Sequence, residues 1–187
     1  MNQEDRRVKK TKALLKQSLA DLLCEKDINN ITIKELTDRV NISRNAFYNH
    51  YEDIYDLYNQ MENELFADIN NLLIESPIDA YEEMLDNLLD YIQSHASIFR
   101  AFLCTKENYL FQMKFSSYFA QKFTDITLFE MGTDQLKDDW KYLVNYHSNG
   151  TISSIAMWIE DNFSYPKEKL LNMIMAIDER SDSLYDE

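Results

Sequence analysis

Two short helical patterns flank a break at positions 41–43, and a connection this tight predicts a helix-turn-helix. Thr32 is a suitable N-cap for the first helix, with Glu35 at the three-residue spacing of a capping box. The apolar residues that recur on one face of this helix are Ile33, Leu36 and Val40. Asn41 is expected to end the helix, because asparagine tolerates the left-handed conformation that follows many helices.

The second helix is expected from Arg44 to about Tyr51, with Ser43 as its N-cap. Ala46 and Phe47 are its apolar residues and are expected to face inward. The residues left for the other face are Ser43, Arg44, Asn45, Tyr48 and His50. Arginine pairs with guanine and asparagine with adenine in the major groove, while hydroxyl and imidazole groups contact phosphate. This face is typical of DNA recognition, although a solvated helical hairpin in an all-α protein would carry similar residues.

The stretch 31–58 reads ITIKELTDRVNISRNAFYNHYEDIYDLY and resembles the DNA-binding segment of the TetR family of bacterial transcriptional regulators. The positions that match the family pattern are Thr32, Ile33, Leu36, Val40, Ile42, Ser43, Phe47, Tyr48, His50, Tyr51 and Leu57. The resemblance implies that Tyr48 and His50 contact phosphate. It also implies that residues 43–45 lie near the bases.

Three positions depart from the family pattern. Asn41 replaces the usual turn glycine, and Thr37 replaces the usual alanine. Ile54 stands where a lysine commonly opens the next helix and touches phosphate, so the resemblance does not supply that contact here. The match covers about the first third of the chain.

Charge is distributed unevenly along the chain. Residues 1–51 carry ten Lys/Arg and seven Asp/Glu, a net charge of +3, whereas the remaining residues carry −17. The stretch 6–16, RRVKKTKALLK, has six basic residues and no acid. It is either a solvated helix start or a first helix and arm that reach phosphates or the minor groove. The DNA-binding residues that we expect are Arg6, Arg7, Lys9, Lys10, Thr32, Ser43, Arg44, Asn45, Tyr48 and His50.

An all-α fold is predicted, because the 187 residues contain two Gly and two Pro and long stretches show helical spacing without sustained alternation. We expect an N-terminal three-helix head with the helix-turn-helix, residues 1–52, for DNA binding. A linking helix over about 53–75 joins it to a C-terminal helical body for ligand binding and dimerisation, and both belong to residues 53–187. The later helices are expected over about 77–94, 97–105, 107–130, 134–162 and 166–178.

The body is rich in aromatic residues. Aromatic and apolar side chains between helices, with a few polar groups, are typical of a ligand pocket. The residues that we expect to line it are Tyr81, Phe99, Phe102, Met113, Phe119, Phe123, Tyr142 and Tyr146. A plain hydrophobic core would use the same residue types. The surplus of acids favours a cationic ligand held by cation–π contacts.

The segment 146–174 reads YHSNGTISSIAMWIEDNFSYPKEKLLNMI and resembles the C-terminal domain of a TetR subgroup that includes regulators of dihydroxyacetone kinase operons. The resembling features are Gly150, Ile155, Trp158, Ile159, Pro166 and Leu170. In the family the last two helices form a four-helix bundle with a second copy, so the resemblance implies a homodimer. The interface residues expected are Ile152, Ile155, Ile159, Leu170, Met173, Ile174 and Ile177. An intramolecular core would show the same spacing, but two heads that read half-sites about 34 Å apart also favour a dimer.

Other classes of site find little support in the sequence. Cys24 and Cys104 show no metal or redox spacing and are expected to be buried. His95, His147 and Cys104 are ligand types for zinc, yet no spacing supports a site, so no metal and no cofactor is expected. No phosphate loop or nucleophile elbow is present, so no enzyme activity is expected. A charged N-terminus and the lack of a run of ~20 apolar residues predict a cytoplasmic protein with no membrane partner.

These patterns together predict a ligand-responsive, sequence-specific transcriptional regulator. Its expected partners are double-stranded DNA with a palindromic operator, an unknown small-molecule effector and a second copy of the chain, and its expected role is repression. One alternative is a TetR-like coactivator that works through a partner protein and binds DNA weakly by itself. Another is a small-molecule enzyme or carrier built on the helical body.

Overall fold

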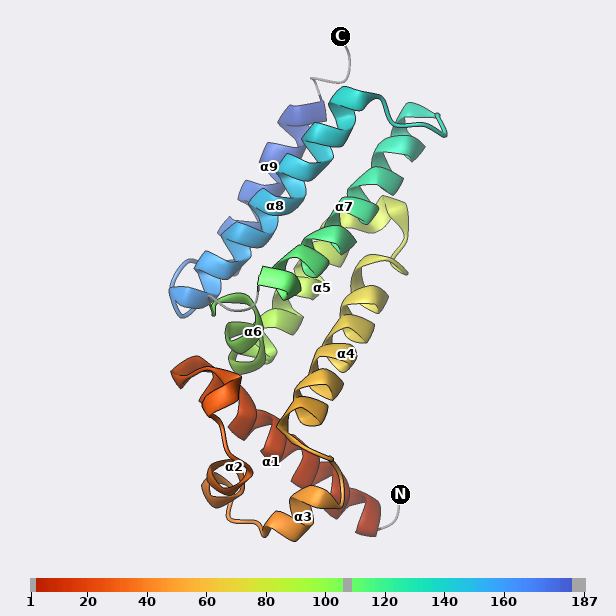
Figure 1. The fold of residues 1–187 in the computed structure, drawn as a ribbon. Coiled ribbons are helices and arrows are strands. Elements are labelled where there is room, and N and C mark those ends of the chain that lie inside the picture. Colours follow the sequence, from red (N-terminus) through yellow and green to blue (C-terminus); the bar gives the residue numbers. More distant parts are fainter. Residues whose placement is uncertain (1–2, 106–108, 183–187) are drawn as a thin grey trace.

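The computed structural model describes residues 3–105 and 109–182, and every regular element within them is helical (Figure 1). The helices are α1 (Gln3–Glu25), α2 (Ile33–Arg39), α3 (Arg44–Tyr48), α4 (Ile54–Leu73), α5 (Tyr81–Ser94), α6 (Ala96–Leu103), α7 (Tyr109–Met131), α8 (Asp138–Glu160) and α9 (Lys167–Asp182), with 3-10 turns η1 (Ile28–Asn30) and η2 (Ile78–Ala80). The prediction of an all-α fold is confirmed. The expected helix ranges differ from the observed ones by a few residues at their ends.

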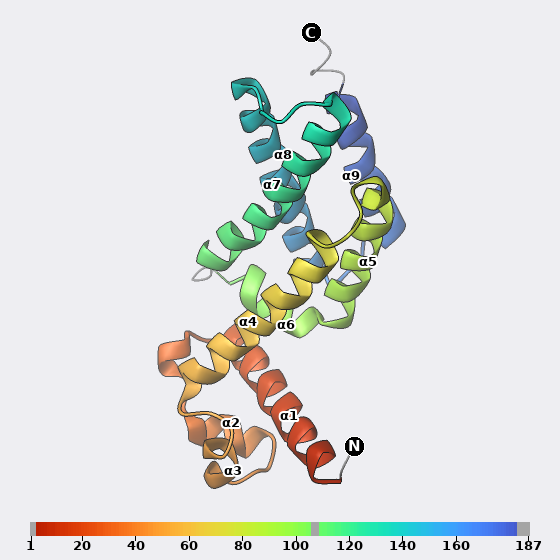
Figure 2. The ribbon, with the colours of Figure 1, turned by 90° about the vertical axis from the view of Figure 1, so that its right-hand side faces the viewer.

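The three N-terminal helices gather at one end of the molecule. Figures 1 and 2 show α1, α2 and α3 at this end, while α4 runs from it into the body formed by α5 to α9. One continuous cluster of buried residues extends from Leu15 and Phe47 in the head to Ile155 and Ile174 in α8 and α9. Head and body therefore share a core.

The break between α2 and α3 is a Schellman motif. Asn41 has a φ of 52°, which places it in the left-handed region. Its N–H donates to Asp38 O at 3.3 Å, and the N–H of Ile42 donates to Thr37 O at 3.1 Å. These two bonds use carbonyls that the helix end would otherwise leave unpaired. The prediction that Asn41 ends the helix without a glycine is confirmed.

Helix α1 joins the head to the body. It packs against α2 and α4 and also against α6. Gln17 Nε2 donates to Ser97 Oγ at 2.8 Å, and Lys16 forms an ion pair with Glu64 on α4. The predicted boundary between residues 52 and 53 therefore lies at the start of a helix and not at a gap in the packing.

Lys122 on α7 is a buried charged residue that the sequence pattern did not single out. Its ammonium donates to the carbonyl oxygen of Ser76 and, at 3.5 Å, to that of Pro77. A cation is favourable near the carbonyl end of a helix, and these residues follow the C-terminus of α4. Desolvation lowers the pKa of Lys122.

The cysteines correct one expectation. Cys24 is exposed and Cys104 is only half-buried, with its Sγ 3.6 Å from Ala156 O. Cys24 follows Leu22 and Leu23, which lie on the buried face of α1, and the helical rotation of about 100° per residue carries the next side chain to the surface.

None of the helices in residues 3–105 and 109–182 is both long and apolar enough to span a bilayer.

Tyr51 is 2% exposed, and its hydroxyl has no hydrogen-bond partner. Desolvation raises the pKa of Tyr51 to about 12. A buried polar group without a partner is unfavourable relative to an apolar group of the same shape. Tyr51 therefore supplies ring packing in the head but no hydroxyl contact.

Replacement of Tyr51 with Phe is expected to raise the free energy of unfolding by about 1 kcal/mol, because it removes the unpaired hydroxyl. The contribution of Tyr51 to stability is fully present below the ordinary tyrosine pKa of about 10. It is lost as pH rises from 10 toward 12, because Tyr51 ionises at a lower pH in the unfolded chain than in the folded one. The variant should lose less stability in that window. Urea unfolding at pH 8 and pH 11 measures both effects, with exposed Tyr109→Phe as the control. A less stable Tyr51→Phe variant would show that the hydroxyl has a partner.

Candidate nucleic-acid interface

The short helix α3 separates into an inner and an outer face. Phe47 is fully buried, and its ring centre lies 5.6 Å from that of Tyr51. Arg44 and Asn45 are exposed, and Tyr48 is 57% exposed. The predicted division of this helix is confirmed for these residues.

Ala46 and His50 are less clearly divided than Phe47 and Tyr48, because both are half-buried. Ala46 is half-buried, in agreement with its expected inward position. The regular helix ends at Tyr48, earlier than expected, and the N–H of His50 donates to Phe47 O at 2.9 Å. His50 is half-buried beside Tyr51, with 6.4 Å between ring centres.

Both helices of the pair begin with a hydroxyl cap. Thr32 Oγ1 accepts from the N–H of Glu35 at 3.2 Å, and Ser43 Oγ accepts from the N–H of Ala46 at 3.2 Å. The Glu35 carboxylate does not complete the expected capping box, because it pairs with Lys26 Nζ at 2.6 Å. Each capping hydroxyl keeps its own hydrogen, which remains available to donate.

Exposed cations lie at the same end of the molecule as α3. Arg6, Arg7, Lys9 and Lys10 are exposed on α1, so within the described residues they belong to a helix and not to an arm. Among the side chains that the structure describes, those of residues 6–105 and 109–178, no carboxylate pairs with these four or with Arg44. This end of the molecule therefore offers free positive charge to an anionic partner.

The next two basic residues of α1 are engaged within the chain. The ammonium of Lys12 lies 5.7 Å from the centre of the Tyr51 ring, and Lys16 pairs with Glu64. The basic stretch of α1 therefore divides into a free N-terminal part and a part that holds the head together.

The start of α4 carries carboxylates and no cation. Ile54 is buried in the core. The N–H of Asp56 donates to Asp53 Oδ1 at 2.8 Å, and the N–H of Glu52 donates to Asp56 Oδ2 at 2.9 Å. This helix start therefore repels phosphate, in contrast to the free cations of α1 and α3.

The residues expected to line an aromatic pocket are spread over the core and the surface. Phe99, Phe102 and Phe119 are fully buried and contact other rings. Tyr81 and Phe123 are half-buried, with ring centres 5.4 Å apart. Of the others, Met113 and Tyr142 are exposed, whereas Tyr146 lines a cavity of about 540 Å³ between α8 and α9.

The residues expected at a dimer interface also fall into two groups. Those buried within a single copy are Ile152, Ile155, Ile159, Leu170 and Ile174. Met173 and Ile177 on α9 are exposed. Tyr142, Tyr146 and Met157 on α8, which the expected set omits, are exposed as well. The four-residue step from Tyr142 to Tyr146 was the sequence signal for this exposed face. It was not decisive, because α8 also carries apolar residues with helical spacing on its buried side.

We name this exposed apolar surface the outer stripe; it consists of Tyr142, Tyr146, Met157, Met173 and Ile177.

The three residues that were considered as zinc ligands do not form a group. The ring of His95 contacts Tyr91 O, the ring of His147 contacts Asp178, and Cys104 contacts Ala156 O. No cluster of three or more His, Cys, Asp or Glu that suits a metal ion occurs among the described residues.

Comparison with known proteins adds a family and a fold. The TetR family model described as "Transcriptional regulator C-terminal region" matches residues 79–178. A curated relative, the uncharacterized HTH-type transcriptional regulator YxbF of Bacillus subtilis (strain 168), is 40% identical over 68 residues, or 36% of this chain. Those residues span 18% of the length of that relative.

Solved structures are similar over nearly the whole chain. The dihydroxyacetone kinase operon activator DhaS has a TM-score of 0.61 at 17% identity and covers 89% of this chain and 93% of its own. A TetR transcriptional regulator from Streptococcus agalactiae 2603V has a TM-score of 0.62 at 22% identity, and the match covers 93% of this chain and 96% of that one. NalD, the secondary repressor of the MexAB-OprM multidrug efflux pump in Pseudomonas aeruginosa, has a TM-score of 0.55 at 16% identity. That match covers 93% of this chain and 97% of NalD. At these identities the likeness shows the fold, which an activator and a repressor share.

Proposed function

This chain belongs to the TetR family of transcriptional regulators, and from that premise we propose that it binds a palindromic operator as a dimer and releases it when a small molecule binds. The observation that supports DNA binding most directly is the exposed face of α3. The exposed side chains of Arg44 and Asn45 lie on its first turn, and Phe47 anchors the opposite face.

We assign different roles to the residues of the interface. Arg44 and Asn45 read base edges, because their side chains pair in two points with guanine and adenine. Ser43 lies beside them and keeps a donor hydrogen for a base or a phosphate. Tyr48 and His50 position the helix on phosphate, as Thr32 does at the start of α2.

The cations of α1, Arg6, Arg7, Lys9 and Lys10, add phosphate contacts that do not depend on sequence. The body, with its large negative charge, repels DNA and leaves only the head in contact. We therefore propose residues 1–52 as the DNA-binding part and residues 53–187 as the regulatory and dimerisation part.

A dimer is proposed through the outer stripe. Its five apolar side chains are exposed in a single copy, and contiguous exposed apolar surface marks interaction sites. Gly150 lies on α8 between Tyr146 and Met157, and a Cβ added to it would meet no atom within 4 Å. A second copy can approach this open part of the helix closely.

Replacement of Ile177 with Glu is expected to raise the dimer dissociation constant at least about tenfold, because a charge would lose water on dimerisation without a partner. Sedimentation equilibrium measures the change. Leu110→Glu is the matched control, since Leu110 on α7 is more exposed and lies outside the stripe. Equal association of both variants and the native chain would remove the outer stripe from the proposal.

The operator itself is tested by selection of bound sequences from random duplex DNA at moderate salt. A palindromic consensus whose affinity falls steeply between two salt concentrations is expected, because each contacted phosphate releases counterions. Loss of affinity on addition of a small molecule then tests the switch, since DNA and ligand must weaken each other equally.

The alternative function is a coactivator that works through a partner protein. The observation that favours it is the acidic start of α4, where Asp53 and Asp56 stand near the buried Ile54. If the selection returns no enriched sequence and binding stays weak, this alternative replaces our proposal. A stable complex with a second protein would then be the defining property.

A further inference from the structure

The two cysteines of the chain lie on opposite sides of the joint between head and body. Cys24 is in the last turn of α1, which ends at Glu25, and Cys104 directly follows the last residue of α6. Both are free thiols; Cys24 is exposed and Cys104 is half-buried. Since the sequence contains no other cysteine, any disulfide within one copy must join these two helices.

Helices α1 and α6 pack against each other through facing residues. Gln17 Nε2 donates to Ser97 Oγ at 2.8 Å, and Ser97 Oγ in turn donates to Gln17 Oε1 at 3.1 Å. About one turn further along each helix, Ala20 and Ala101 are fully buried. The distance between two packed helices depends on the side chains at their contact, so alanines allow a close approach.

The cysteines continue the faces that carry this contact. Seven residues make almost two turns of a helix, so a side chain lies on nearly the same face as the one seven positions before it. Cys24 comes seven residues after Gln17, and Cys104 comes seven residues after Ser97. If the two helices run in the same direction, the cysteines therefore face each other as well.

The electrostatic surroundings of the two thiols indicate that the helices do run in the same direction. Burial raises the pKa of Cys104 to about 12, and the charges of Glu160, Arg100 and Cys24 also act on this thiol. Burial likewise raises the pKa of Cys24, an effect that the Arg100 guanidinium opposes. Interactions between charges weaken with distance, so the two thiols and Arg100 form one group. Sγ of Cys104 lies 3.6 Å from Ala156 O, and rotation about its one side-chain torsion can turn it toward α1.

We propose that Cys24 and Cys104 form a reversible disulfide that joins the head to the body. The oxidant is a small disulfide such as oxidised glutathione. The thiolate of Cys24 attacks it, forms a mixed disulfide and releases one glutathione thiolate. Cys104 loses its proton to water and attacks the sulfur of Cys24, which closes the bridge and releases the second glutathione thiolate. Two protein thiols are thus oxidised to one disulfide while one small disulfide is reduced to two thiols.

The surroundings of the two thiols set the order and the rate of these steps. Cys24 reacts first because it is exposed, whereas Cys104 is half-buried. Both pKa values are raised, so few of these thiols are ionised at neutral pH and closure takes minutes to hours. The exposed sulfur of Cys24 remains open to attack by a small thiol, which reduces the bridge again.

The bridge is compatible with the packing because both cysteines lie at helix ends. The Cα atoms of a disulfide are usually about 4.4–6.8 Å apart, and the frayed last turn of a helix adjusts to such a distance more easily than its middle. Cys24 is next to the end of α1, and Cys104 is the C-cap of α6.

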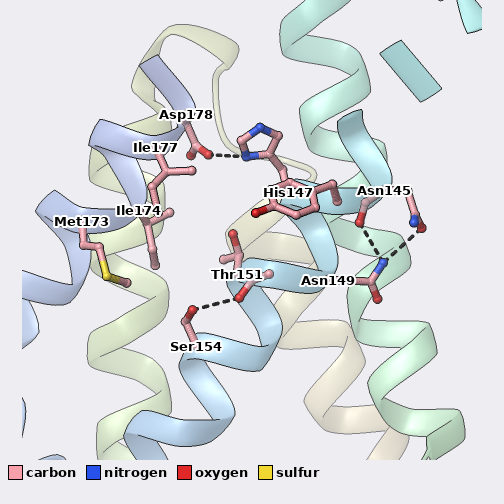
Figure 3. Close-up of a pocket in the computed structure, with 11 residues that line it drawn as sticks. Asn145, His147, Asn149, Thr151, Ser154, Met173, Ile174, Ile177 and Asp178 are labelled. Carbon is pink, nitrogen blue, oxygen red and sulfur yellow. Dashed lines mark hydrogen bonds and ion pairs between the residues drawn. The ribbon is translucent and has the colours of Figure 1, made fainter. Parts of the chain in front are cut away.

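The bridge would connect the head to the helices that carry the outer stripe. Helix α6 holds the end of α8, because Arg100 Nη2 donates to Ile159 O at 2.8 Å. Helices α8 and α9 line one cavity from its two sides, with Thr151 on α8 and Ile174 and Ile177 on α9 (Figure 3). Oxidation would therefore restrict the movement of α1 relative to this part of the body.

The test oxidises the full chain at low concentration with glutathione disulfide at pH 8, stops the reaction with acid and measures the mass. We expect the native chain to lose two hydrogens, to yield one peptide pair that joins Cys24 to Cys104, and to regain the hydrogens with excess dithiothreitol. Cys104→Ser is expected to gain one glutathionyl group instead, because no second thiol resolves the mixed disulfide. Cys24→Ser should react at least about tenfold more slowly, since its remaining thiol is half-buried.

A displaced thiol tests the facing arrangement. The double variant Cys24→Ser/Glu25→Cys moves the thiol by about 100° around α1. It then replaces a side chain that pairs with Arg39 Nη2 of α2 at 2.6 Å. This variant should close the bridge at least about tenfold more slowly than the native chain. The inference is overturned if the native chain keeps a glutathionyl group without closing the bridge, if oxidation joins two copies instead, or if the displaced thiol closes equally fast.

A second measurement compares the stability of the oxidised and reduced chains. The bridge closes a long loop, so the oxidised chain should unfold at a higher urea concentration than the reduced chain. Unfolding of the oxidised chain at the same or a lower urea concentration would mean that the bridge distorts the packing of α1 on α6, and it would overturn the inference. Both measurements are made without DNA, so their outcome is independent of the operator selection.

Discussion

Replacement of Arg44 with Ala is expected to weaken binding to the selected operator by roughly 5- to 150-fold, which corresponds to about 1–3 kcal/mol. Arg44 is exposed on the first turn of α3, and no carboxylate among the described residues pairs with it. The preference for one base pair in each half-site should relax at the same time. Fluorescence anisotropy with the selected duplex and with single-base variants measures both effects.

Tyr48→Phe provides the contrasting variant on the same helix. It removes a hydroxyl that we assign to phosphate, so selected and random duplexes should lose affinity by the same factor. Lys169→Ala on α9 removes an exposed cation from the body and should leave both affinities unchanged. If Arg44→Ala and Tyr48→Phe both cause equal losses on all sequences, then α3 does not divide its contacts as proposed.

Replacement of Phe111 with Ala is expected to lower the free energy of unfolding by about 3–5 kcal/mol. Phe111 on α7 is 1% exposed. Its ring centre lies 4.7 Å from that of Phe66 on α4 and 5.1 Å from that of Phe102 on α6. Removal of the ring leaves a cavity where three helices meet. Urea unfolding followed by circular dichroism measures the loss.

The same helix supplies the control for this prediction. Phe129 is 66% exposed, so Phe129→Ala should change the free energy of unfolding by no more than about 0.5 kcal/mol. A small effect at Phe111 would mean that the aromatic rings of the body pack loosely. The expectation of an effector pocket among them would then gain support.

The features that the sequence predicted well are local. Thr32, Ser43 and Asp53 each cap the helix that follows, through bonds that span three residues. Asn41 ends α2 in the left-handed conformation. Each of these structures depends on groups within a few positions of one another, so the residue types and their spacing are sufficient. The inner and outer faces of α3 follow from the same short-range periodicity.

The cluster of side chains around Asp178 was beyond the reach of pattern analysis for a different reason. His147 and Asp178 come from different helices, and Tyr81 comes from a third, distant segment. No spacing rule connects them, because only the packing of α5, α8 and α9 brings them together. Lys122, which donates to carbonyls far away in the sequence, is a similar case.

The sequence by itself determined the helices, their caps and the character of the head, since these depend on short-range hydrogen bonds and helical periodicity. The tertiary structure decided which apolar face is inside. Helix α8 carries Ile155 on one side and Tyr146 on the other, and both sides have helical spacing. Only the contacts with α6 and α7 bury the first and leave the second exposed, because burial depends on neighbours that are distant in the chain.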